Sequence, residues 1–188
     1  MSKPPKKYAL VGTSCVGKTT LLSRTKAFLN ANDPRLKVAI VPEAARIYFS
    51  QRSASNPFSY LHQKNIQDLV KEFEDQAEKT FPDIILCDRS VIDAVAYVKA
   101  TDDEKGYKAL VENVSQWLLT YTHFFLLDPR GVPYETDDIR KENLQTREKF
   151  HKGFLDVFLS YPLPYSFISG TLDERLNKIV QIIYSQPL

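Results

Sequence analysis

A glycine-rich motif at residues 12–20 constrains this chain more than any other stretch. It reads Gly12-Thr13-Ser14-Cys15-Val16-Gly17-Lys18-Thr19-Thr20 and fits the pattern G-x-x-x-x-G-K-[ST]. The apolar run 8–11 before it predicts a buried strand, and residues 21–29 after it lack Gly and Pro and predict a helix. A loop in this position presents backbone N–H groups and a helix N-terminus to a phosphate. The motif therefore predicts a nucleoside triphosphate site.

Two side chains of the motif match a phosphoryl-transfer template. Lys18 would place a positive charge on the β- and γ-phosphates, and the Thr19 hydroxyl would be a ligand of Mg²⁺. We therefore expect ATP and Mg²⁺ as cofactors.

Composition limits the class of protein. The 188 residues suit a single domain over 1–188, with 43% hydrophobic residues and a net charge of +2 that gives no sign of a nucleic-acid partner. No apolar run approaches membrane-spanning length, so we expect no membrane partner. The two cysteines, Cys15 and Cys87, offer no disulfide framework, which suits a cytoplasmic protein. We expect a monomer or a homodimer.

Strands and helices alternate along the chain. Short apolar runs predict strands at 7–11, 37–41, 84–87, 123–127 and 165–169. Helices are expected at 17–30, 43–49, 60–79, 90–100, 140–159 and 172–184, with one more helix carrying Leu110, Val114, Trp117 and Leu118. Within 60–79, the apolar residues at helical spacing are Leu61, Ile66, Leu69, Val70, Phe73 and Ala77. The alternation predicts a three-layer α/β fold, with about five parallel strands covered by helices on both faces.

Carboxylates follow two of the predicted strands. Asp88 ends an apolar strand and could hold Mg²⁺ directly or through water. Asp128 competes for this role, because it also ends an apolar strand and opens a D-x-x-G pattern with Gly131, as in a GTPase switch. The guanine-reading N-K-x-D pattern is missing downstream, so we favour Asp88 as the metal-side carboxylate.

Glu43 and Arg46 begin the helix after the second strand. Glu43 could orient or deprotonate a hydroxyl acceptor near the γ-phosphate, but the helix dipole alone also favours an acidic residue there. Arg46 could face the same cleft or be a solvated helix residue. Arg140 and Arg147 lie two turns apart and would suit a closing lid, although their charged neighbours favour a plain exposed surface.

Three further segments carry a resemblance to a known family. Val41-Pro42-Glu43-Ala44-Ala45-Arg46, the run from Cys87-Asp88-Arg89 through Asp93 to Tyr97, and Asp137-Asp138-Ile139-Arg140 follow the glycine-rich motif in order. Together they resemble the NadR-like P-loop ATPase/kinase domains, which include a ribosylnicotinamide kinase domain. More distantly, Pro42-Glu43 and Asp88-Arg89-Ser90 are similar to motifs of deoxyribonucleoside kinases.

The resemblance implies a nucleoside/nucleotide-kinase-like P-loop fold with a helical lid at about 129–150. It implies a general base at Glu43, a Mg²⁺ partner at Asp88, a phosphate clamp at Arg89, acceptor contacts at Arg46, Asp93 and Tyr97, and lid arginines at Arg140 and Arg147. The expected activity is phosphoryl transfer from ATP to a small hydroxyl-bearing acceptor, such as a nucleoside or nicotinamide riboside. The alternative is a regulatory ATPase read by a protein partner, with switch segments at 51–58 and 128–131.

Overall fold

Five parallel strands form one sheet in the order β2-β3-β1-β4-β5. The computed structural model describes residues 3–52, 54–132 and 144–186. Its strands are β1 (Lys6–Val11), β2 (Val38–Val41), β3 (Ile84–Asp88), β4 (His123–Leu127) and β5 (Tyr165–Ile168). The strand that leads into the phosphate loop is central, with Ala9 paired to Cys87 of β3 and to Phe124 of β4. The predicted parallel α/β sheet is confirmed.

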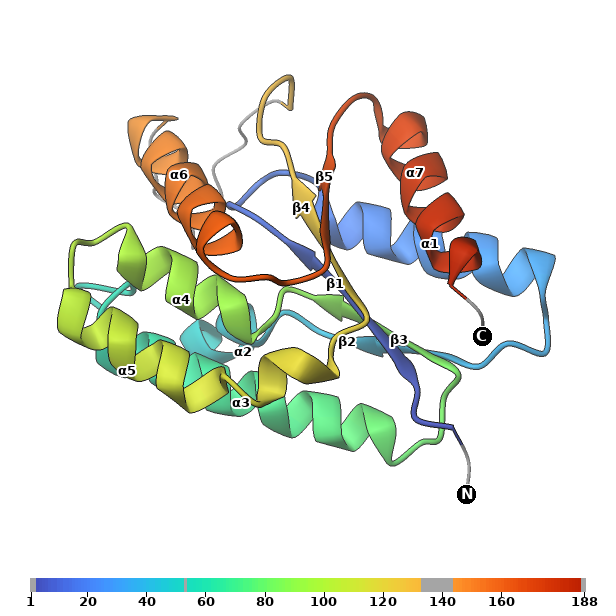
Figure 1. Cartoon of the computed structure of the whole chain (residues 1–188), viewed down its shortest axis with the longest axis horizontal. Coiled ribbons are helices and arrows are strands. Elements are labelled where there is room, and N and C mark those ends of the chain that lie inside the picture. The colour runs from blue at the N-terminus through green and yellow to red at the C-terminus, as the bar shows by residue number, and fades with distance from the viewer. Residues whose placement is uncertain (1–2, 53, 133–143, 187–188) are drawn as a thin grey trace.

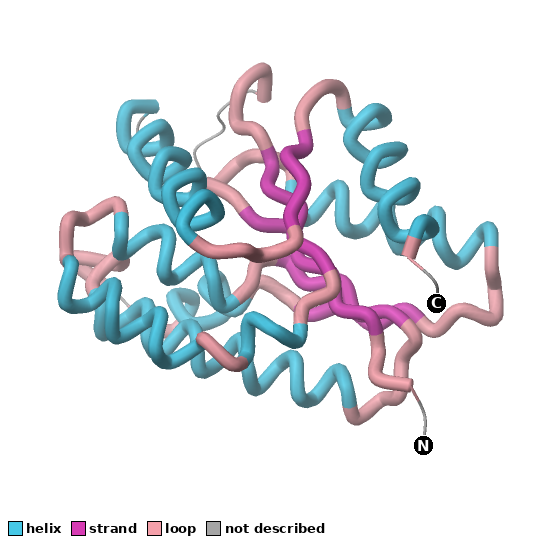
Figure 2. Tube along the Cα trace, viewed as in Figure 1, coloured by secondary structure: helices cyan, strands magenta, loops and turns pink. Residues whose placement is uncertain are grey.

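Helices cover both faces of the sheet (Figures 1 and 2). One face carries α1 (Lys18–Asn32) and α7 (Leu172–Ser185). The other carries α2 (Ala44–Ser50), α3 (Tyr60–Glu78), α4 (Val91–Lys99), α5 (Glu104–Val114) and α6 (Leu144–Ser160). Within the described ranges, no helix is both long and apolar enough to cross a bilayer.

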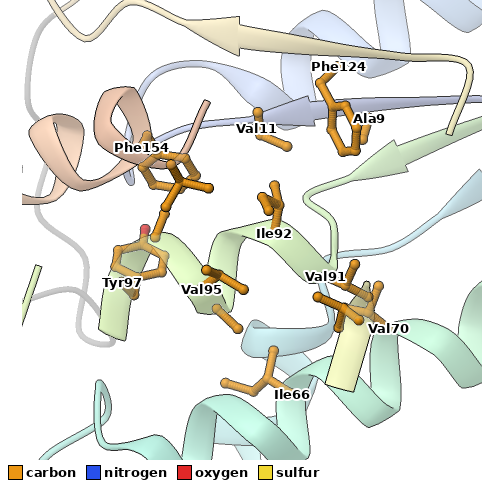
Figure 3. Packing of buried hydrophobic residues seen from close by; sticks show 14 of the residues in the cluster. Ala9, Val11, Ile66, Val70, Val91, Ile92, Val95, Tyr97, Phe124 and Phe154 are labelled. Carbon is orange, nitrogen blue, oxygen red and sulfur yellow. The ribbon is translucent and has the colours of Figure 1, made fainter. Parts of the chain in front are cut away.

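The protein has an apolar core on each face of the sheet, and alternate residues of β1 point into one or the other. Tyr8 and Leu10 pack with α1 and α7, whereas Ala9 and Val11 face the layer that contains α4. Helix α4 lies in the middle of that layer and is buried almost all round, against α3 on one side and α6 on the other (Figure 3). The chain segments that follow β1, β2 and β3 therefore meet at one edge of the sheet, where parallel α/β folds bind ligands.

Helix α3 turns its predicted apolar face inward, with Ile66 and Val70 buried, but this face also carries polar residues and leaves out Leu61. Leu61 is 63% exposed, whereas Gln67 and Glu74 are fully buried. The Gln67 amide donates to the Val91 carbonyl at 3.0 Å and accepts from the Asn113 amide at 3.0 Å. Because these bonds satisfy the buried amide, a polar residue is tolerated on the inner face.

The helix expected to carry Leu110 through Leu118 is two elements, so that prediction was wrong. Helix α5 ends at Val114, and a separate 3₁₀ turn, η1, covers Trp117–Thr120. The Trp117 indole donates to Glu74 of α3 at 2.8 Å, and Thr120 accepts from the Lys7 amine at 3.1 Å. These long-range bonds hold η1 against α3 and β1. The local spacing of apolar residues cannot predict such contacts, so it did not predict the break after Val114.

Candidate functional site

Residues 12–20 form a loop between β1 and α1 whose shape depends on glycine. Gly12 has φ 135° and Gly17, at the start of α1, has φ 80°, in the region that glycine adopts without steric cost. A Cβ on Gly12 would lie 3.2 Å from the Leu127 carbonyl oxygen of β4. The loop therefore curls closely over the sheet, as a phosphate cradle requires.

The Lys18 side chain is buried inside this loop. Its Nζ donates to the carbonyls of Gly12 at 3.0 Å and Thr13 at 2.5 Å. Burial, aided by the nearby Arg89 guanidinium, lowers the pKa of Lys18 to about 7. A bound polyphosphate would favour the charged amine, because an opposite charge nearby stabilises the ionised form.

Thr19 and Asp88 provide oxygen atoms suited to a magnesium ion. The Thr19 hydroxyl donates to Asp88 Oδ2 at 2.5 Å, and Asp88 Oδ1 is buried with no hydrogen-bond partner among the described residues. Buried carboxylate and hydroxyl oxygens next to a phosphate cradle match the ligand preference of Mg²⁺. Both side chains therefore fit the ion, and their role as its ligands stays a prediction.

Asp128, the competing carboxylate, is engaged elsewhere. Its two oxygens accept a bidentate pair from Arg130 at 2.9–3.1 Å. Burial opposes the charge of Asp128, but the Arg130 bonds outweigh it and lower the carboxyl pKa. Because Asp128 is already paired with Arg130, this geometry favours Asp88 over Asp128 as the metal-side carboxylate.

Arg175 of α7 fastens the phosphate loop to the sheet, and sequence reasoning missed it. Its guanidinium donates to the carbonyls of Val16 at 3.3 Å, Asp128 at 3.1 Å and Gly170 at 2.8 Å. The arginine is 3% exposed although it belongs to an amphipathic helix. A basic residue placed among apolar helix positions was the only sequence signal of this contact.

Arg89 joins the phosphate loop to the neighbouring cavity. It adopts φ 77°, an uncommon left-handed conformation for a non-glycine residue, directly after β3. Its Nε donates to Glu43 at 2.7 Å, and its Nη1 donates to the Gly12 carbonyl, Asp93 and the Tyr97 hydroxyl at 3.0–3.1 Å. Burial works against the charge, but the oxygens of Tyr97, Glu43 and Asp93 raise the pKa of Arg89 well above its usual value.

The predicted acceptor residues gather around this guanidinium. Glu43 also lies 3.6 Å from the Nε of Arg46, which is half-exposed at the rim. Asp93 accepts from the backbone and hydroxyl of Ser90 and so closes the capping box of α4. Burial raises the pKa of Asp93, although the charges of Arg89 and Lys18 oppose this rise. Asp93 therefore positions Arg89 and α4 as well as lining the cavity.

A cavity of about 100 Å³ opens beside these charges. Ser14 of the phosphate loop and the Glu43–Arg89–Asp93 group form its polar end. The remaining wall is mostly apolar and comes from Ala44, Phe49, Pro57, Phe58, Ile66, Val70, Ala94 and Tyr97. Sequence reasoning placed Phe58 only in the 51–58 segment and did not assign it to the cavity, because residues 52–57 just before it match no motif.

The two arginines proposed for a lid have different outcomes. Arg147 is buried near the start of α6, and its guanidinium donates to the carbonyls of Cys15 at 3.4 Å, Pro129 at 3.0 Å and Val132 at 3.3 Å. It therefore contacts the phosphate loop and is not part of an exposed surface. Arg140 and Asp137 lie outside the described residues.

A protein-family comparison agrees with this geometry. The family model described as an AAA domain matches residues 7–175, so the chain belongs to that family. No match was found among curated protein sequences.

Solved structures show the same fold at low sequence identity. NadR in complex with NR aligns with a TM-score of 0.79 and 16% identity over 97% of this chain and 51% of NadR, so the chain spans about half of that protein. Thymidylate kinase from Ehrlichia chaffeensis gives 0.69 and 14% over 96% of this chain and 100% of its own. Deoxyadenosine kinase from M. mycoides gives 0.64 and 14% over 96% and 100%. The fold is that of P-loop kinases, as the resemblance to NadR-like domains implied.

Proposed function

We propose that this protein transfers the γ-phosphoryl group of ATP to a hydroxyl of a small metabolite, with a nucleoside or a nucleoside-like molecule such as nicotinamide riboside as the acceptor. The observation that carries the proposal is a carboxylate, Glu43, in the polar end of a cavity that Ser14 connects to the phosphate loop. Donor and acceptor sites thus share a wall.

The chain's own groups account for the phosphate side of the reaction. Amides of residues 12–20 and the Lys18 amine would hold the triphosphate. Thr19 and Asp88 would hold Mg²⁺, which when bound neutralises charge on the β- and γ-phosphates. Catalysis of this kind depends on positioning and electrostatic stabilisation.

Glu43 would orient the acceptor. Its carboxylate is fixed by Arg89 at 2.7 Å, and an oxygen held in this way can accept the proton of an acceptor hydroxyl. Phe49, Phe58 and Tyr97 on the cavity wall suit a flat ring. A nucleoside combines a ring with hydroxyl groups and therefore fits both parts of the cavity.

The charge balance of the cavity favours an acceptor without a phosphate. The similar folds include kinases named for a nucleoside and for a nucleotide, so the fold does not decide between these classes. The described lining carries two guanidiniums, from Arg46 and Arg89, and two carboxylates, from Glu43 and Asp93. Both guanidiniums already face a carboxylate, which leaves little surplus positive charge for an acceptor phosphate.

The proposal is tested by ADP release from Mg·ATP, with and without nucleosides, their 5′-monophosphates and nicotinamide riboside, and by mass measurement of the product. We expect one nucleoside-like acceptor to give a phosphorylated product in step with ADP, and Lys18→Met to abolish both. Slow hydrolysis that no small acceptor stimulates would contradict the proposal and favour the regulatory ATPase. Transfer to a monophosphate alone would contradict the choice of acceptor.

A further inference from the structure

A second cavity lies on the side of α6 that faces β5. It measures about 400 Å³ and is lined by Arg130, His151, Leu155, Tyr165 and Phe167. These residues differ from those around the cavity beside Glu43, which we call the acceptor cavity, and they lie outside the phosphate loop at 12–20. A volume of this size is enough for a small organic molecule. The second cavity therefore offers a site that the proposed reaction does not use.

Helix α6 separates the two cavities. Its Phe150 packs on Phe58 and Tyr97 of the acceptor cavity, with ring centroids 4.4 Å and 4.8 Å away. The next residue, His151, lies against Phe167 of β5 at 6.1 Å. In Figure 1, α4 lies below α6 and β5 lies to its right. Successive residues of one helix thus border different cavities, so a molecule in the second cavity does not occupy the place of the acceptor.

Aromatic side chains form the wall of the second cavity toward β5. The Phe167 ring lies beneath the Arg130 guanidinium at 6.0 Å. Tyr165, on the same face of the strand, packs on the buried Phe158 at 4.8 Å. Leu155 of α6 adds an apolar side chain to the lining. Flat aromatic surfaces of this kind favour a ligand that contains a ring.

Arg130 lies at the rim of this cavity, where its side chain is 78% exposed. Asp128 accepts hydrogen bonds from its Nε and Nη2 at 2.9–3.1 Å, whereas Nη1 has no hydrogen bond to a described residue. The charge of Asp128 also acts on Arg175, whose guanidinium donates to neutral carbonyls. Because one carboxylate faces two guanidiniums, this region favours an added negative charge.

His151 supplies a second polar contact. Burial lowers its pKa, and the charge of Arg130 adds to this effect while Asp128 opposes it, so the imidazole is neutral at pH 7. Its Nδ1 is buried without a hydrogen-bond partner among the described residues, which is costly. A half-turn of the ring about the Cβ–Cγ bond exchanges Nδ1 with Cδ2, and the N–H can then donate to a ligand in the cavity. A bound acceptor oxygen would favour the turned ring.

We propose that the second cavity binds a small aromatic carboxylate, with its ring against Tyr165 and Phe167 and its carboxylate between Arg130 Nη1 and His151. Two donors match the two oxygens of a carboxylate. A phosphate dianion would instead bring a second charge toward Asp128 and a third oxygen for which these residues offer no donor. The site is separate from phosphoryl transfer and does not depend on the proposed function.

Benzoate is the probe, and amide chemical shifts of the whole ¹⁵N-labelled protein report where it binds. We expect saturable shifts at residues 151–155 and 165–167, with a dissociation constant of about 1 mM or below, and unchanged signals at 43–46. Benzamide, which lacks the charge, and cyclohexanecarboxylate, which lacks the flat ring, should bind more weakly. Saturating Mg·AMP-PNP should not displace benzoate.

Three variants test the role of the guanidinium. Arg130→Gln should weaken benzoate binding by about tenfold or more, because it removes a charge-assisted hydrogen bond. Arg35→Gln is the matched control and should keep full binding, because Arg35 also lies two residues after an aspartate, Asp33, but lines neither cavity. Asp128→Asn removes a negative charge and releases the Arg130 guanidinium, so it should tighten binding.

The proposal fails if millimolar benzoate shifts none of the amides at 151–155 and 165–167, or if it shifts 43–46 instead, which would place it in the acceptor cavity. Displacement by Mg·AMP-PNP would place it in the nucleotide site and also overturn the proposal. Equal binding in Arg130→Gln would remove the guanidinium from the site, and tighter binding of phenyl phosphate would overturn the carboxylate as the ligand class. None of these results bears on phosphoryl transfer, which ADP release measures separately.

Discussion

Two buried cations lie at opposite ends of the sheet, and each is flanked by two carboxylates. Lys7, near the start of β1, lies 3.0 Å from Glu74 and 2.8 Å from Glu78. Arg89, just after the end of β3, lies 2.7 Å from Glu43 and 3.1 Å from Asp93. Their composition is alike, but their surroundings differ.

The Lys7 group opens to no cavity among the described residues: Lys7 and Glu74 are buried, and only Glu78 is partly exposed. Trp117 and Tyr121 both donate to Glu74, and the Lys7 amine lies over their two rings at 5.2 Å and 5.4 Å. Burial opposes the charge of Lys7, but Glu74 and Glu78 outweigh it and raise the pKa of the amine. Because its partners fill the space around it, this group binds elements of the fold to one another.

The Arg89 group, in contrast, faces a cavity and includes a left-handed residue. Glu43, Arg89 and Asp93 all line the space beside Ser14. Strained backbone of this kind clusters at functional sites, although Phe81 and Asp102 also adopt it in turns. A buried ion pair is therefore a poor marker of a site by itself, and its opening to a cavity beside the phosphate loop is the informative feature.

The largest expected effect is on turnover, at the open group. Glu43→Gln keeps the shape of the side chain but removes its capacity to accept a proton, so phosphoryl transfer should fall by about 10²- to 10⁴-fold. Binding of Mg·AMP-PNP, measured by calorimetry, should persist. Arg46→Gln at the exposed rim is the control and should lose far less. Full turnover in Glu43→Gln would show that this group is structural, like the Lys7 group.

The closed group should instead determine stability. Glu74→Gln leaves Lys7 with only the half-exposed Glu78, and breaking a buried pair in this way costs about 3–5 kcal/mol. Chemical unfolding measures the loss, and turnover per folded molecule should not change. Glu78→Gln, the control, should cost about 1 kcal/mol or less. A catalytic defect in folded Glu74→Gln protein would contradict the assignment of the Lys7 group to stability and of the Arg89 group to catalysis.

A smaller effect separates the two strand-end aspartates. Asp88→Asn should weaken Mg²⁺-dependent nucleotide binding by about ten- to a hundredfold, the range for altered metal-site partners. Asp128→Asn, whose partner is Arg130, should leave the Mg²⁺ dependence unchanged. A magnesium titration of AMP-PNP affinity makes the comparison. The opposite ranking would assign the metal to Asp128.

The sequence predicted those features that depend on local patterns. The phosphate loop and the strand–helix alternation follow from residue type and spacing, and parallel topology then brings Asp88 to Thr19. Contacts between distant segments were not predictable in this way. Lys7 and Glu74 meet across 67 residues, and Phe58 reaches Phe150 from a segment without a motif.

Arg89 shows the same limit at the site itself. Its position in the motif suggested a phosphate clamp, but the left-handed backbone turns its side chain toward Glu43, Asp93 and the Gly12 carbonyl. A left-handed conformation at an arginine cannot be predicted from the residue type or from its neighbours in the sequence. Its role toward phosphate stays a prediction.

The strand order has a consequence for biosynthesis. β1 leaves the ribosome before its two neighbours in the sheet, β3 and β4, which end at Asp88 and Leu127. At about 5–20 residues per second, β1 waits on the order of ten seconds for both partners. The loop at residues 12–20 waits longer still, because Arg175, which ties Val16 to the sheet, belongs to α7. A nascent chain thus carries its nucleotide motif well before it carries the helix that completes the phosphate loop.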